Sequence, residues 1–108
     1  MVSGVDVPHG VTMQASIVEA EGTTTVLATR DARRLGIYPE FVAAWLTLEV
    51  NSALDAVGLT AAVSTALAAE GIPCNVLAGY HHDHQLVPAE QSNKAIAVLN
   101  ALSETDLP

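Results

Sequence analysis

The chain has 108 residues, which is enough for one domain and too short for two ordinary ones. Of these residues 50% are apolar and only 4% are aromatic, so a globular core must be built from Ala, Val, Leu and Ile. The 12 Asp and Glu residues outnumber the 4 Lys and Arg residues, and the formal charge of −8 repels phosphate backbones and anionic lipid headgroups. We therefore expect neither nucleic acid nor a membrane surface as a partner.

The number of cysteines and the length of the apolar runs indicate in which cellular compartment the protein is expected. Cys74 is the only cysteine, so a disulfide within the chain is excluded. A basic start followed by a long apolar run directs a chain to secretion, and the sequence does not show this pattern. The apolar runs end well before the ~20 residues that a membrane helix needs. We expect a protein of the reducing cytoplasm.

The N-terminal part of the chain predicts a hairpin. Residues 1–12 contain Gly and Pro without periodicity and are expected to form a flexible lead-in. Residues 15–20 and 23–28 are rich in Val, Ile and Thr and flank Glu21 and Gly22. Two such runs joined by a Gly-containing turn predict a β-hairpin.

A short helical turn is predicted after the hairpin. The side chain of Asp31 can cap it and Gly36 can end it. Arg33 and Arg34 are neighbouring basic residues that could hold an anion. In a chain this acidic, a solvated ion pair with Asp31 or Glu40 is the favoured interpretation.

The side chains of residues 44–50 alternate between two faces, which predicts a strand. One of its faces is expected to pack against helices. The core face carries Leu46, Leu48 and Val50, and the other face carries Trp45, Thr47 and Glu49. An aromatic side chain on an open sheet face indicates that something covers that face. The N-terminal hairpin and a second subunit are equally good candidates.

A helix is predicted from about residue 56 to residue 70. Ser52 and Asp55 resemble a capping arrangement before it, and Gly71 with Pro73 supplies its end. One apolar stripe at helical spacing supports it. The stripe consists of Leu59, Ala62, Val63, Ala66 and Leu67.

Two short strands and a second helix follow. Residues 72–78 form an apolar strand, residues 79–83 turn the chain, and residues 84–87 return antiparallel. Cys74 is expected to pack in the core, because no basic residue nearby in sequence would activate its thiol. Pro88 suits the start of a helix whose stripe is Ala95, Leu99 and Leu102, with Ile96 and Val98 beside it.

The order strand, helix, strand, strand, helix predicts an α+β fold of the ferredoxin-like βαββαβ type without its last strand. The N-terminal hairpin is the only unused β segment. We therefore expect it to pair with the free edge of the strand at residues 44–50 and so complete or extend the sheet.

Four segments of this stretch resemble the ACT domain, and in particular small stand-alone bacterial ACT proteins. They are WLTLEV at 45–50, LDAVGL at 54–59, GIPCNV at 71–76 and YHHDHQLVP at 80–88. The resemblance implies one ACT-like domain over residues 13–108, with the hairpin and short helix in 13–42 and the ACT core in 43–102. It also implies a regulatory, non-enzymatic homodimer.

Many ACT domains bind an amino acid between the first strand-helix loop and a neighbouring copy. The matching positions here are Asn51, Ser52, Leu54, Asp55, Val57, Gly58 and Leu59. The free N–H groups at the start of a helix also favour a carboxylate. The alternative is that Ser52 or Asp55 only caps the helix. Asn51, Ser52 and Ala53 stand where the family usually has a Gly-rich break.

The densest set of potential metal ligands is His81, His82, Asp83 and His84. Imidazole and carboxylate suit Zn, Ni or Cu, and His82 and His84 would be the ligands. Adjacent side chains diverge in a tight hairpin, so a turn in which Asp83 accepts backbone N–H groups is favoured. We expect no cofactor.

The predicted function is that of a regulatory protein that binds an amino acid. Two alternatives stay open: an assembly module that binds a partner protein, and a metal-binding protein. An enzyme is not expected, because the sequence has no nucleophile-base pair and no Gly-rich phosphate loop.

Overall fold

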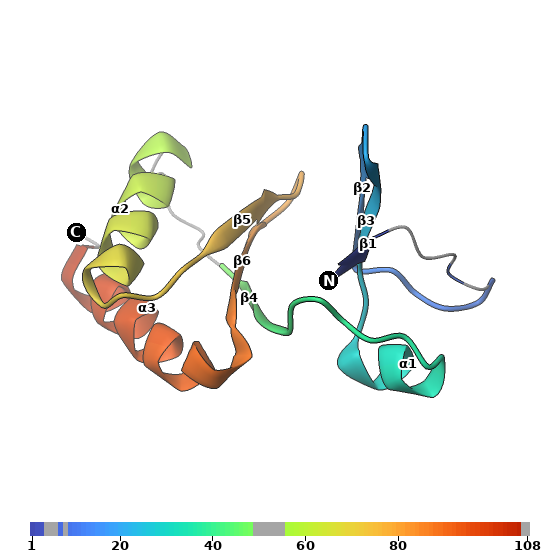
Figure 1. Ribbon diagram of the computed structural model, residues 1–108. Helices are drawn as coiled ribbons and strands as arrows, with labels where there is room; N and C mark the ends of the chain where they lie inside the picture. The colour runs from blue at the N-terminus through green and yellow to red at the C-terminus, as the bar shows by residue number, and fades with distance from the viewer. Residues whose placement is uncertain (4–6, 8, 49–55, 107–108) are drawn as a thin grey trace. The chain divides into compact units, whose positions relative to one another are not determined.

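The computed structural model describes residues 1–3, 7, 9–48 and 56–106 (Figure 1). The chain divides into two compact units, Met1–Val42 and Ala43–Pro108. Each unit has its own antiparallel sheet of three strands.

The first unit contains the predicted hairpin. Strands β2 (Ala15–Glu19) and β3 (Gly22–Val26) pair antiparallel, with Glu19 opposite Gly22. The turn therefore falls on Ala20 and Glu21, one residue earlier than expected. Gly22 has a φ of 145°, which explains why a glycine follows the turn.

The predicted partner of this hairpin was wrong. In the described chain the hairpin belongs to a separate sheet from residues 43–47. In that sheet, of order β1-β3-β2, β3 pairs on its other side with β1 (Val2–Ser3). This two-residue strand lies within the expected lead-in. A pair of residues carries no periodicity, so the sequence pattern could not predict it.

Helix α1 (Thr29–Arg34) is the predicted short helix, and Gly36 follows it with a φ of 71°. Asp31 does not cap it: the N-cap is Ala28, without a side-chain cap. Instead, Oδ1 of Asp31 accepts a hydrogen bond of 3.2 Å from Nη2 of Arg34. The expected surface ion pair is thereby confirmed, and such a pair contributes little stability.

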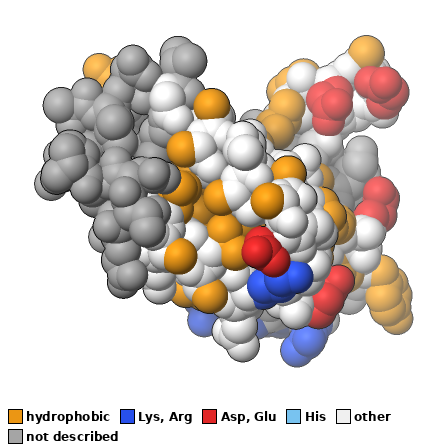
Figure 2. All heavy atoms as spheres, turned by 90° about the vertical axis from the view of Figure 1, so that its left-hand side faces the viewer, with side chains coloured by type: hydrophobic (Ala, Val, Ile, Leu, Met, Phe, Trp, Pro, Cys, Tyr) orange, Lys and Arg blue, Asp and Glu red, His pale blue; other side chains and the backbone are white. Residues whose placement is uncertain are grey.

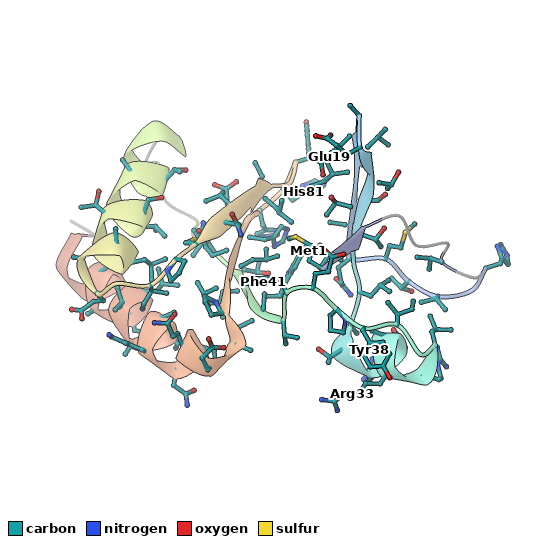
Figure 3. The ribbon with its side chains drawn as sticks, viewed as in Figure 1. Met1, Glu19, Arg33, Tyr38, Phe41 and His81 are labelled. Carbon is teal, nitrogen blue, oxygen red and sulfur yellow. The ribbon has the colours of Figure 1, made fainter. Side chains whose placement is uncertain are left out.

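Hydrogen bonds connect Met1 to the last loop of the first unit. The amino group of Met1 donates to the carbonyl oxygen of Phe41 over 2.8 Å, and the carbonyl oxygen of Met1 accepts from the N–H of Glu40 over 3.2 Å (Figure 3). Burial lowers the pKa of this amino group, and the charge of Glu40 opposes that shift.

The second unit has the predicted order strand, helix, strand, strand, helix. Its elements are β4 (Ala43–Thr47), α2 (Ala56–Ala69), β5 (Asn75–Ala78), β6 (Asp83–Pro88), a 3-10 turn (Ala89–Gln91) and α3 (Ser92–Asp106). The antiparallel sheet order is β4-β6-β5, and both helices lie on the same side of the sheet (Figure 1). The predicted α+β, ferredoxin-like fold is confirmed.

The core of this unit lies between the sheet and the two helices. It is built from Val63 and Leu67 of α2, Ile72, Val87 of β6 and Ala95 of α3. The predicted stripes of both helices supply these contacts, although Ile96 is 42% exposed and lies beside the buried stripe. Aliphatic side chains thus form the core, as the low aromatic content requires.

Strand β4 alternates as predicted. Ala44, Leu46 and Leu48 pack against the core, which leaves Trp45 and Thr47 on the other face. The predicted end of this strand, Glu49 and Val50, lies outside the described residues. Within the described residues, none of the helices combines the length and the apolarity that crossing a bilayer takes.

Candidate ligand loop and the family of the chain

The predicted ligand loop joins the end of β4 to the start of α2. Asn51, Ser52, Leu54 and Asp55 lie outside the described residues. Val57, Gly58 and Leu59 lie in the first turn of α2, where Gly58 is exposed. The partial positive charge at the start of a helix favours an anion at this end.

The loop begins beside the first residue of β6. The N–H of Leu48 donates to the carbonyl oxygen of Asp83 over 3.0 Å, next to the last register pair, Thr47 with His84. Gln85 and Val87 point toward the helices, and Asp83 shares their face because side chains alternate along a strand. A half-buried carboxylate therefore lies on the helix-facing side where β4 ends. From its sequence context Asp83 was interpreted as a turn residue or a potential metal ligand.

The outer face of the sheet carries a small aromatic cluster. The rings of Trp45 and His84 are 4.7 Å apart between centroids, tilted by 32°. The hydroxyl of Thr47 lies 3.0 Å from Nδ1 of His84. Leu86, opposite Trp45 in the register, is only 1% exposed. These contacts fix the His84 ring against β4.

The comparison with protein families decides the identity of the second unit. Residues 40–101, which include β4, α2, β5, β6 and most of α3, match the family model described as ACT domain. The chain belongs to the ACT domain family. The match includes the whole predicted ligand loop.

A similar solved structure supports the fold. It is a Vibrio cholerae protein of unknown function, named as a possible transport protein, and it is 40% identical in sequence to this ACT protein. The match covers 85% of this chain and 70% of that chain, with a TM-score of 0.76. No curated protein matches the chain significantly.

The histidine turn of this ACT domain does not gather its side chains. His84 contacts Trp45, whereas His81 lies edge-on to Tyr80 with ring centroids 5.0 Å apart. The turn is closed by the backbone, where the N–H of Gly79 donates to the carbonyl oxygen of His82 over 2.9 Å. Among the described residues, no group of three or more His, Cys, Asp and Glu could hold a metal ion.

Cys74 lies on the core side of the sheet, as predicted, and is partly buried. Its Sγ donates to Oε1 of Gln85 over 2.7 Å. Burial raises the pKa of the Cys74 thiol, so the reactive thiolate is disfavoured. The thiol therefore has a packing role in this ACT domain.

Proposed function

We propose that this ACT protein is a regulatory, non-enzymatic protein of the bacterial cytoplasm that binds an amino acid as a homodimer. The observation that carries the proposal is the ACT match over residues 40–101, which spans the strand-helix loop used for ligands in many family members. The residues proposed to bind are the seven loop positions named from the sequence.

The chemistry of the loop supports an amino acid ligand. The first turn of α2 contains no acidic residue, so no side-chain charge in that turn repels an α-carboxylate drawn to the positive end of the helix dipole. Asp55 is the proposed acceptor of the ammonium group. Asp83 supplies a second carboxylate near the start of the loop. Leu54, Val57 and Leu59 offer apolar surface to the ligand side chain.

Substitution of Asp55 separates ligand binding from capping. If Asp55 binds the ligand, Asp55→Asn weakens amino acid binding more than tenfold, about 1.4 kcal/mol, measured by calorimetry. The free energy of unfolding should change little, because Asn still caps a helix well. Asp83→Asn, compared in parallel, shows whether the second carboxylate contributes.

A capping role gives the opposite pattern. In that case Asp55→Ala lowers the free energy of unfolding by about 1 kcal/mol, while amino acid affinity stays that of the wild type. That result would remove Asp55 from the proposed site.

One observation favours the alternative of a protein-binding module. Helix α2 contains no charged residue over Ala56–Ala69. Among the positions of α2 whose burial the structure describes, the exposed ones are the small residues Gly58, Ala61, Ser64, Thr65, Ala68 and Ala69. Figure 2, which looks onto the helices, shows apolar and uncharged side chains over most of the described face. A surface without charge is less costly to desolvate in a protein interface.

A further inference from the structure

The basic residues of the chain are concentrated in helix α1. Of the 4 Lys and Arg residues, Arg30, Arg33 and Arg34 lie in this helix, together with a single acidic residue, Asp31. Three positive side chains and one negative side chain give α1 a net charge of +2, in a chain whose formal charge is −8. The fourth basic residue, Lys94, lies in α3 of the second unit. Helix α1 therefore attracts anions although the protein as a whole repels them.

The three arginines lie on the outer face of α1. Residues at positions i, i+3 and i+4 share one side of a helix, and this is the spacing of Arg30, Arg33 and Arg34. All three are exposed, whereas Ala32, on the opposite side, is 4% exposed. In Figure 3, Arg33 points away from the sheet of the first unit. The helix thus packs on its unit through Ala32 and directs its guanidinium groups outward.

Two of these guanidinium groups have no ionic partner among the described residues. Arg34 pairs with Asp31, whereas neither Arg30 nor Arg33 forms an ion pair within the described ranges. The side chain of Arg34 is itself 67% exposed, so a carboxylate from another molecule can reach it. Exposed ion pairs contribute little stability to a fold. The three arginines are therefore available to bind a partner.

An exposed aromatic ring follows this helix directly. The helix ends in a glycine turn, where the N–H of Gly36 donates to the carbonyl oxygen of Arg33 over 3.1 Å. In the same turn the N–H of Ile37 donates to the carbonyl oxygen of Ala32 over 2.9 Å. These two bonds hold the next residue, Tyr38, beside the last turn of α1. Tyr38 is 90% exposed, so its ring gains almost nothing from the folding of its own chain.

We propose that Arg30, Arg33, Arg34 and Tyr38, here named the arginine face, form a docking surface for an acidic segment of a partner protein. A guanidinium group binds a carboxylate through two parallel hydrogen bonds, which makes the contact directional. Tyr and Arg are also among the residue types that supply most of the binding energy in protein interfaces. The arginine face combines both types with a charge that is complementary to an acidic partner.

A protein segment fits the arginine face better than a small anion does. Sites for small molecules are concave and enclose most of the ligand. The arginine face is the outer side of one short helix, which is convex and leaves a small ligand in water. An extended acidic segment can contact several arginines along the helix and place an apolar side chain on Tyr38. Nucleic acid is disfavoured by the formal charge of −8.

This inference goes beyond the proposed function. A regulatory protein without catalysis acts through a partner protein, and the arginine face offers a surface to that partner. The face involves residues 30–38, whereas the proposed amino acid site involves residues 51–59. The two proposals can therefore fail independently.

Fluorescence anisotropy with an acidic peptide tests the docking surface. The probe is a fluorescein-labelled peptide of about eight glutamates around one phenylalanine, and the control peptide has glutamine in place of each glutamate. Both are titrated with the full chain, without amino acid, in about 20 mM salt, where screening is weak. We expect the glutamate peptide to bind and the glutamine peptide not to bind. The affinity should fall as the salt concentration rises.

Single substitutions separate the arginine face from the net charge. Arg33→Gln should weaken peptide binding about fivefold, and Arg30→Gln should act in the same direction. Lys94→Gln is the matched control, because it removes the same charge from a side chain that is 53% exposed and lies outside the face. It should change the affinity less than about twofold. Tyr38→Ser leaves the charge unchanged and should also weaken binding.

Three results would overturn the proposal. The first is equal weakening by Arg33→Gln and Lys94→Gln, which would mean that only net charge matters. The second is no binding of the glutamate peptide to a protein that is folded by circular dichroism. The third is complete displacement of the peptide by millimolar inorganic phosphate but not by sodium chloride of equal ionic strength, which would make the face a small-anion site. A failed amino acid screen, by contrast, refutes the proposed ligand and leaves the docking surface standing.

Discussion

At the scale of single residues, the contact between Cys74 and Gln85 shows how a polar pair can be placed inside an aliphatic layer. Gln85 is 1% exposed, and its Oε1 accepts the Cys74 thiol at 2.7 Å. A buried amide without a partner is costly, so the thiol has a structural reason to stay protonated.

The reactivity of Cys74 follows from this contact. Because burial raises its pKa, thiol modification by a disulfide reagent at pH 8 should be slower than for an unfolded chain. Urea should restore the full rate. A folded-state rate equal to the unfolded one would contradict the buried, protonated thiol.

The raised pKa of Cys74 also determines in which direction the free energy of unfolding changes with pH. A thiol whose pKa is raised on folding stabilises the fold fully below its unfolded pKa, and this contribution is lost as pH rises through the folded pKa. The free energy of unfolding should therefore fall more between pH 8 and about 10.5 for the wild type than for Cys74→Ala. Equal slopes in denaturant titrations would show that the thiol has no such role.

Gly71 is a position where the backbone demands glycine. It follows α2 with a φ of 69°, and a Cβ there would meet no atom within 4 Å. Gly71→Ala should lower the free energy of unfolding by about 1 kcal/mol through backbone strain alone. Gly71→Asn is the control, since Asn tolerates this conformation, and it should cost less in urea unfolding. An equal cost for both would argue against strain as the cause.

At the scale of elements, the sequence predicted the helices and strands whose characteristic pattern lies within one continuous segment. Helix α2 has a stripe and a glycine stop, and β4 alternates, so both were located from the sequence alone. β1 was missed, and the hairpin was assigned to the wrong sheet. Strand partners depend on contacts distant in sequence, which local periodicity does not encode.

Helix α2 should depend on its buried stripe and little on its outer face. Leu67 is 0% exposed, so Leu67→Ala should lower the free energy of unfolding by about 2–5 kcal/mol. Thr65→Ala, on the exposed side of the same helix, should change it by less than about 0.5 kcal/mol. Similar effects at both positions in urea denaturation would contradict the assigned core.

At the scale of the whole molecule, the sequence predicted the family more fully than it predicted the site. Four local segments sufficed to indicate the ACT domain, and residues 40–101 match its model. The proposed site depends on how a loop, a helix start and, in the proposed dimer, a second copy come together. Asp83 illustrates the difference: it follows a turn in sequence, yet its carbonyl oxygen contacts Leu48 at the end of β4.

The central claim, that this ACT protein binds an amino acid, is tested most directly by thermal unfolding against each of the twenty amino acids. A ligand at 100 times its Kd should add about 2.7 kcal/mol of stability, visible as a rise in Tm for one amino acid or a few related ones. The proposed function requires such a selective rise. A folded, dimeric protein whose Tm is unchanged by every amino acid at millimolar concentration would contradict it and favour the protein-binding alternative.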